Sequence, residues 1–301
     1  MERLLVLFST PYYIVIILAE IILSNARKLH LYSLQDTLSN LYLMLLNALL
    51  DVGFRFFYAG IVLAWAYNHR IFEIKNPWLY WLILLVSEDF LFYWLHRFDH
   101  NIRFFWATHV THHSSEKFNF SVGFRSSVFQ PLYRFIYFLP LPFLGFQPMD
   151  VVFIFSATQI WGIFVHTELI QKMGFLEMFM VTPSHHRVHH GSNPAYLDKN
   201  MGMFLIIWDK IFGTFQAEIP AAYYQPIRYG LTSNLTHINP VNLVFHEWIA
   251  IFRDASKPGL SLSQRLKYIF GPPGWSHDGH RKTSEQLRQE ELMANNGSLI
   301  K

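Results

Sequence analysis

Long apolar stretches constrain this chain most, because a helix that crosses a bilayer needs about 20 consecutive, mostly apolar residues. Residues 4–24 and 39–67 form two such stretches, and residues 77–95 form a third. Two further apolar runs cover residues 128–146 and 148–165, and the prolines and glycine of "LPLPFLGFQP" indicate a tight hairpin between them. We therefore expect an all-α, polytopic membrane protein with four or five transmembrane helices.

The composition agrees with a membrane protein. Of the 301 residues, 52% are hydrophobic and 15% are charged, whereas about a quarter of the residues of a soluble domain are charged. The net charge of +3, without long lysine or arginine runs, gives no sign of a nucleic-acid partner. The absence of cysteine excludes disulfides, thiolate haem and cysteine-based metal clusters, which leaves 16 histidines as the abundant metal ligands.

Charge and hydropathy divide the chain into three parts. We expect N-terminal transmembrane helices over residues 1–76, a histidine-rich region over 77–220, and a cytosolic C-terminal region over 221–301. If the histidines lie in the cytoplasm, most of the nearby arginines and lysines lie there too, as the positive-inside rule favours. This orientation also puts all the histidine clusters on one side, as a helical cap on the membrane helices.

Three short motifs, "HRFDH", "HVTHH" and "HHRVHH", carry the chemistry. Histidines three or four residues apart share one face of a helix, with Cβ atoms roughly 5–6 Å apart. Two further histidines stand close to the motifs, His166 after the last apolar run and His185 at the start of the third motif. The eight motif histidines at helical spacing are His96, His100, His109, His112, His113, His186, His189 and His190.

Eight or more histidines exceed the needs of one metal ion and fit two ions with open positions. All-nitrogen ligation suits iron, copper, zinc or nickel. A metal pair below apolar helices can meet a lipid chain, and breaking an unactivated C–H bond there requires an oxidant that iron and dioxygen can supply. A single histidine near a membrane is usually an interfacial residue, and we expect the isolated ones to be non-ligands: His30, His69, His237, His246, His277 and His280.

The three motifs resemble the histidine boxes of the fatty acid hydroxylase and sterol desaturase superfamily, over roughly residues 85–220. "THHSSEKFNFS", "HTELI" and "TPSHHRVHHG" look most like the alkylglycerol monooxygenase branch. The resemblance implies a catalytic domain over residues 77–220, two iron ions, dioxygen and a lipid substrate. It implies that the eight motif histidines are ligands, with His166 as a ninth and His185 as a ligand or a neighbour of one.

The resemblance leaves the reaction and the reductant open. The substrate is a sterol, a fatty acyl chain or an ether lipid, and the reaction is hydroxylation, desaturation or ether cleavage. The alkylglycerol branch uses tetrahydrobiopterin as its reductant, while other branches receive electrons from a cytochrome b5 type protein or a ferredoxin.

Carboxylates close to the histidines are candidates to support the ligands, because metal-bound imidazoles usually donate their other N–H group. We select Asp89 and Glu168 for this role, with an ion pair to Arg55 as the alternative for Asp89. Asp99 is expected on a solvated helix face. A different class of function, a divalent-metal transporter or metal-binding membrane protein, would place ligands near the bilayer midplane rather than at the ends of spans.

Overall fold

The computed structural model describes residues 2–298, and over this range the chain is helical, with no β-strand beyond one isolated bridge between Met180 and Leu205. Within the described residues, three helical stretches are long and apolar enough to cross a membrane: Ser9–Ala26, Leu34–Asn68 and Pro77–Asn101. A shorter apolar helix, α8, covers Pro148–Phe164. The expected all-α fold with several membrane helices is confirmed.

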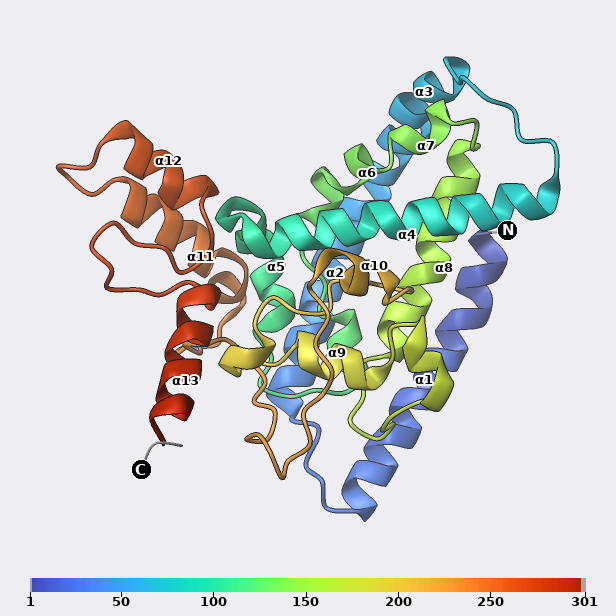
Figure 1. Ribbon diagram of the computed structural model, residues 1–301. Helices are drawn as coiled ribbons and strands as arrows, with labels where there is room; N and C mark the ends of the chain where they lie inside the picture. The colour runs from blue at the N-terminus through green and yellow to red at the C-terminus, as the bar shows by residue number, and fades with distance from the viewer. Residues whose placement is uncertain (1, 299–301) are drawn as a thin grey trace.

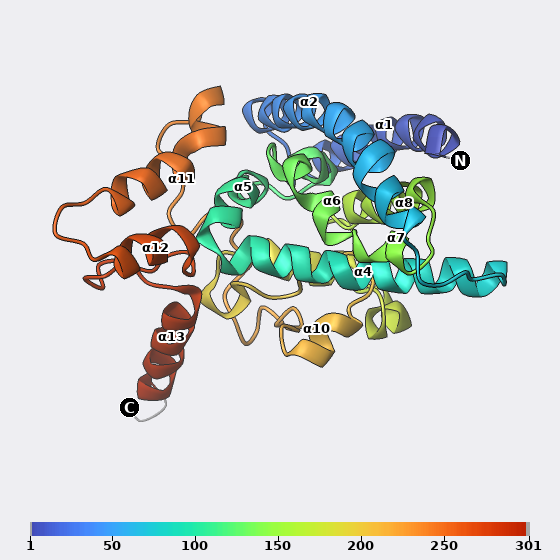
Figure 2. The ribbon, with the colours of Figure 1, turned by 90° about the horizontal axis from the view of Figure 1, so that it is seen from above.

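Two N-terminal helices form one face of the molecule, on the upper side in Figure 2. Helix α1 covers Glu2–Ala26, and α2 covers Leu34–Phe57 after a start at Ser33, whose hydroxyl accepts a hydrogen bond from the Asp36 amide. Helix α2 continues through the π-helical turn η1 (Tyr58–Leu63) into α3 (Ala64–Asn68). Large apolar side chains on both long helices point outward, as expected for a surface in contact with lipid.

Helix α4 (Pro77–Asn101) crosses the middle of the molecule (Figure 1). Asn76 caps its first turn by accepting hydrogen bonds from the Trp78 and Leu79 amides, and Pro77 occupies the first helical position, where no N–H group is needed. One extended residue, Ile102, separates α4 from α5 (Arg103–His113). The turn brings the first histidine motif against the second.

The apolar run over residues 128–146 does not form one continuous helix. The segment consists of three short pieces, which are η3 (Gln130–Leu132), α6 (Arg134–Tyr137) and α7 (Pro140–Phe143). Pro131, Pro140 and Pro142 lack the amide hydrogen that a continuous helix requires. Pro131 lies at the start of η3, and Pro140 is the first residue of α7, so that α6 ends before it. The chain then turns at Gly145, where φ is +103° and a Cβ would lie 2.4 Å from the Phe72 carbonyl oxygen.

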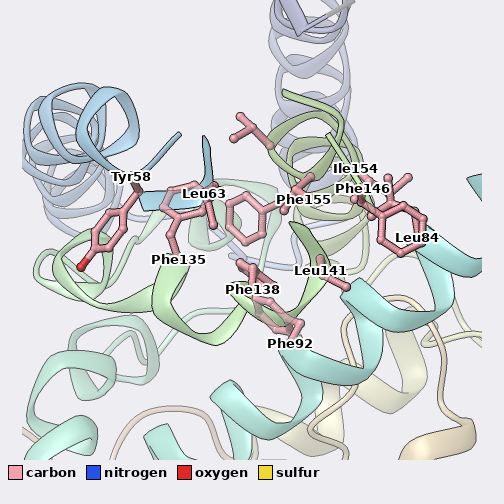
Figure 3. Close-up of a cluster of buried hydrophobic side chains, with 12 residues drawn as sticks. Tyr58, Leu63, Leu84, Phe92, Phe135, Phe138, Leu141, Phe146, Ile154 and Phe155 are labelled. Atoms are coloured by element: carbon pink, nitrogen blue, oxygen red, sulfur yellow. The ribbon is translucent and has the colours of Figure 1, made fainter. Parts of the chain in front are cut away.

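The main hydrophobic core lies where α4, α8 and these short helices meet. Phe92 of α4, Phe155 of α8, and Phe135 and Phe138 of the broken segment point toward one another (Figure 3). The ring centroids of Phe138 and Phe155 are 5.4 Å apart. This aromatic packing fixes α4 relative to α8. Helix α4 carries His96 and His100, and α8 ends just before His166.

The chain after α8 covers the side of α4 opposite α1 and α2, and one end of the molecule (Figures 1 and 2). The C-terminal helices α11 (Pro240–Ala255), α12 (Leu262–Phe270) and α13 (Ser284–Ser298) lie at the end next to α5. The connecting elements before them are η2 (Phe120–Phe124), η4 (Gly174–Met178), α9 (Pro183–His189), η5 (Pro194–Tyr196) and α10 (Ile207–Phe212).

Candidate metal centre

Nine of the ten predicted histidines converge on one place, although they come from four separate segments. The last turns of α4 supply His96 and His100, α5 supplies three histidines, the turn after α8 supplies His166, and α9 with its C-cap supplies three more. Each helix ends or turns at this point, so that short backbone segments from distant parts of the sequence present imidazoles to a common interior.

The nine histidines form two groups, and each group could hold a metal ion. Within a group, one ring nitrogen from each member lies within 4.8 Å of those of all the other members. The five-histidine cluster consists of His96, His100, His109, His113 and His189, and the four-histidine cluster consists of His112, His166, His186 and His190. The clusters are adjacent, because the stacked rings of His113 and His190 have centroids only 4.4 Å apart.

Each HxxHH motif serves both clusters, whereas the sequence predicted one shared face for its three histidines. In α5, His109 and His113 join the five-histidine cluster and His112 joins the other. In α9, His186 and His190 join the four-histidine cluster and His189 joins the other. The i and i+4 residues of each motif therefore act together, and the i+3 residue reaches across to the neighbouring cluster.

Backbone carbonyl groups fix the tautomer of several of these rings. The Nδ1 atom of His96 lies 2.8 Å from the carbonyl oxygen of Met201, and that of His166 lies 2.7 Å from the carbonyl oxygen of Gly162. The carbonyl oxygens of Arg125 and Lys199 accept in the same way from His112 and His189. Because a carbonyl oxygen can only accept, Nδ1 carries the proton in each case and a neutral ring directs an Nε2 lone pair into its cluster.

The inward-facing nitrogens fit a cation. The Nε2 atoms of His166 and His112 are 3.4 Å apart, and the Nε2 atoms of His186 and His166 are 2.9 Å apart. Two nitrogens bound to one ion at about 2.0–2.1 Å have separations of this size. The buried Nε2 atoms of His100 and His189 have no hydrogen-bond partner in the described part of the chain, which is unusual for buried polar atoms.

Burial keeps the imidazoles outside the membrane-spanning helices neutral, as metal ligation requires. Desolvation is the largest effect on each of these rings, and it lowers the pKa of His112 to about 4. It also lowers the pKa values of His109, His113, His186 and His190 well below the ordinary value, with further lowering from neighbouring histidines. At neutral pH these rings do not hold the second proton that would block metal binding.

The tenth predicted histidine, His185, lies apart from both clusters. Its ring packs on Phe215, and its Nδ1 atom lies 3.4 Å from the Thr182 hydroxyl oxygen. The six isolated histidines also lie outside both clusters.

The structure assigns the predicted carboxylates to other contacts. Asp89 accepts hydrogen bonds from the amides of Phe204 and Leu205 and from the Trp208 indole, and these bonds hold residues 204–208 against α4. It does not pair with Arg55, which binds Asp51 instead. Burial raises the pKa of the Glu168 carboxyl group, and Arg187 partly offsets this. Glu168 has no hydrogen bond to a histidine among the described residues.

Asp99 is fully buried, and the expectation of a solvated position is wrong. Its two oxygens accept hydrogen bonds from the Tyr133 hydroxyl and the Gln130 amide, at 2.7 and 2.8 Å. The broken segment packs over this side of α4 and removes Asp99 from solvent, and the helical spacing of the first motif contains no signal for that contact.

Sequence reasoning did not select Asp198, although it is the carboxylate that contacts a clustered histidine most closely. Its Oδ1 atom lies 3.2 Å from Nδ1 of His100. Asp198 and Asn200 both have positive φ, at 53° and 54°, and Asn200 holds this loop by donating hydrogen bonds to the carbonyl oxygens of His185 and Gln216. The only sequence signal is "DKN", since Asp and Asn tolerate this backbone conformation better than most residues.

Among the cavities that touch clustered histidines, two share no lining residue within the described part of the chain. The first, of about 290 Å³, is lined by side chains of α1, α2 and α8 and touches His96, His109, His112, His166 and His186. We call it the membrane-side cavity. The second, of about 270 Å³, is lined by α5 and loops of the C-terminal part and touches the other four histidines. We call it the C-terminal cavity.

The chain is similar to proteins named for the oxidation of lipids. Residues 81–214 match the family model described as fatty acid hydroxylase. The chain is 35% identical over 271 residues to an alkylglycerol monooxygenase of Xenopus tropicalis and 36% identical over 272 residues to one of Homo sapiens. Each match covers 89% of this chain but only 58% and 59% of those proteins.

More distant similarity extends to sterol enzymes. A lathosterol oxidase of Mus musculus is 28% identical over 153 residues, which is 48% of this chain and 48% of that protein. No solved structure matches the chain. The comparisons confirm the resemblance that the histidine boxes indicated.

Proposed function

Because residues 81–214 match the fatty acid hydroxylase model, we propose that the protein is a membrane-bound, non-haem di-iron oxygenase that oxidises a C–H bond of a lipid with dioxygen. The observation that carries the proposal is the pair of adjacent histidine clusters beside a cavity lined by membrane helices. We propose residues 77–220 as the catalytic domain and the cytoplasm as the side on which the histidines lie.

The nine clustered histidines would hold two iron ions. When bound, such a pair supplies, with dioxygen and two electrons, an oxidant strong enough for an unactivated C–H bond. The chain's own contribution is to fix the Nε2 atoms through carbonyl groups, to keep the rings neutral, and to admit the substrate through the membrane-side cavity. A lipid carbon in this cavity would gain a hydroxyl group from one oxygen atom of dioxygen, and the second oxygen atom, with the two electrons and two protons from solvent, would leave as water.

Among the substrate classes, we propose an ether lipid as the first to test, because alkylglycerol monooxygenases are among the similar proteins. Hydroxylation of the carbon next to an ether oxygen gives a hemiacetal, which breaks down into an aldehyde and an alcohol. A fatty acyl or sterol substrate, with hydroxylation or desaturation as the reaction, stays an alternative.

We propose that electrons arrive on the other side of the metal centre, through the C-terminal cavity. It reaches His100, His113 and His189 of the five-histidine cluster, and its wall carries Trp106 and Asp198. The reductant is tetrahydrobiopterin, a ferredoxin or a cytochrome b5 type protein, and each can be supplied separately to the purified enzyme.

The rival function, metal transport or storage, receives less support. A transported ion needs ligands along a path through the bilayer. The nine histidines instead form two closed clusters where helices end, and eight of the nine are less than one-tenth exposed.

The test is oxygen incorporation. Detergent-purified protein, loaded with ferrous iron, is given an alkylglycerol, a fatty acid or a sterol with each reductant under ¹⁸O₂, and products are identified by mass spectrometry. We expect one ¹⁸O atom in the product of at least one lipid, or an oxygen-dependent double bond. Iron-loaded protein that oxidises none of the lipids with any reductant would contradict the proposal.

A further inference from the structure

An ion-pair group lies within the membrane-side cavity and has no part in holding the metal centre. It consists of Asp51 and Arg55 of α2, and Arg134 of α6. Asp51 forms ion pairs with both guanidinium groups, and its contact with Arg55 is 2.6 Å. All three side chains line the same cavity as the clustered histidines.

The position of this group makes a purely structural role costly. Asp51 and Arg55 lie in the middle of the apolar stretch Leu34–Asn68, where charged side chains are expensive and usually mark a binding site or a transport path. The guanidinium groups of Arg55 and Arg134 and the carboxylate of Asp51 all line this cavity.

This group has a buried hydrogen-bond donor without a partner, whereas its acceptor Asp51 Oδ1 is ion-paired with Arg134. Arg134 is 7% exposed, and its Nε atom has no hydrogen-bond partner among the described residues. The nearby cavity-lining Gln159 also has a buried amide nitrogen without a partner. Because a buried donor without a partner is costly, a ligand that completes this site must offer acceptor oxygens.

Aromatic rings separate the ion-pair group from the metal centre. The Arg134 guanidinium lies 4.7 Å from the centroid of the Phe155 ring. Phe155 is followed by Phe92 at 6.4 Å and then by His96 at 5.7 Å from Phe92. Both phenylalanines lie in the aromatic core of Figure 3. The cavity thus has a donor-rich polar site, an apolar wall and a metal-facing end.

We propose that Arg134, with Asp51 and Arg55, binds an oxygen-bearing group of the lipid substrate inside the membrane-side cavity. This inference rests on the proposed function, because it assigns the same cavity to the substrate. The site selects lipids that carry acceptor oxygens, which are neutral in an alkylglycerol and anionic in a fatty acid. It also holds the hydrocarbon chain in a fixed position, so that one carbon faces the metal centre.

The test is equilibrium binding without dioxygen or reductant, so that failure of turnover does not affect the result. Radiolabelled 1-O-hexadecylglycerol, palmitate and hexadecane are bound to detergent-purified protein, and metal content is measured on the same samples. We expect the wild type to bind at least one oxygen-bearing lipid at least tenfold more tightly than hexadecane, and Arg134→Gln to remove that preference. The lipid that loses more affinity in the variant identifies the neutral or the anionic group.

Two further variants keep the test decisive. Asp51→Asn with Arg134→Gln removes both charges together and serves if Arg134→Gln alone does not fold; it should also lose the preference. Arg253→Gln, an exposed arginine of α11, is the matched control and should bind like the wild type. Equal binding of hexadecane and both oxygen-bearing lipids by the wild type, or an unchanged preference in the folded Arg134 variant, would overturn the inference.

Discussion

At the scale of single residues, the division of each histidine triplet between two clusters explains the HxxHH spacing. His109 and His113 are one helical turn apart and bring their rings to within 4.9 Å, while His112 turns toward His166 and His190. A motif with only one pair at i and i+4 could fill one cluster but not contribute to its neighbour. The i+3 histidine is therefore the residue that makes a second metal site possible.

This assignment predicts different outcomes for substitutions of His112 and of His185. We expect His112→Ala to abolish lipid oxidation and reduce the bound metal, because the four-histidine cluster loses a ligand. His185→Ala should keep both metals and turnover within severalfold of the wild type, because its ring lies outside the clusters. Metal analysis and turnover of both variants check this; full activity in His112→Ala would remove that residue from the ligand set.

Asp198 is expected to support His100 without binding metal itself. Its carboxylate accepts from Nδ1 of His100, and loss of such a partner typically lowers metal affinity or activity about 10- to 100-fold. Asp198→Asn should therefore lose iron to a chelator at lower chelator concentration than the wild type, with little change in Tm. Asp278→Asn removes an exposed aspartate that pairs with the peripheral His280, and it is the matched control. Equal iron retention in Asp198→Asn and the wild type would show that this contact does not support the site.

At the scale of elements, α5 is held between the membrane helices and the C-terminal helices. Arg103, in its first turn, binds Glu247 and Asp254 of α11 at 2.6 and 2.9 Å, and donates to the Tyr268 carbonyl oxygen. Asp254 also binds Arg281, so that one carboxylate joins α5, α11 and the segment before α13. Removing one partner from a buried ion pair leaves the other charge uncompensated, which is strongly destabilising.

The pH dependence of this connection follows from Asp254. Burial raises its pKa, but hydrogen bonds from Arg281 and Arg103 outweigh burial, and the pKa lies below its ordinary value of 3.8. A carboxyl group with a lowered pKa stabilises the fold above its unfolded pKa, and this stability is lost as pH falls through the folded pKa. We expect Asp254→Asn to lower Tm at pH 7, with a difference from the wild type that shrinks below about pH 4.

Thermal unfolding in detergent between pH 7 and 3 checks this expectation. Glu290→Gln, which alters an exposed pair with Lys282, should behave like the wild type throughout. A Tm difference for Asp254→Asn that is the same at every pH would show that its charge does not stabilise the connection.

At the scale of the whole molecule, the sequence predicted the all-α fold and which histidines gather, but it did not predict the long-range contacts around them. Short-range helical spacing is encoded within a few residues, so nine of the ten selected histidines meet. The burial of Asp99 and the contact of Asp198 with His100 depend on segments about 30 and 100 residues away. Hydropathy alone also treated residues 128–146 as one span, because it ignored the helix-breaking effect of Pro131, Pro140 and Pro142.

The two cavities offer two separate approaches to the metal centre. The membrane-side cavity and the C-terminal cavity share no lining residue, yet between them they touch all nine clustered histidines. Substrate and reductant can therefore approach the metal centre separately, one among α1, α2 and α8 and the other among the C-terminal loops. Under the proposed function, this separation would let the lipid stay within the bilayer while the reductant uses the other cavity.

The most direct test of the central claim is the metal content of detergent-purified protein from cells grown with iron-57, measured by elemental analysis and Mössbauer spectroscopy. Two clusters of five and four histidines should hold about two irons per chain, with the signature of a coupled non-haem pair. A chain that holds one metal ion or none, even after anaerobic reconstitution with ferrous iron, would contradict a di-iron centre.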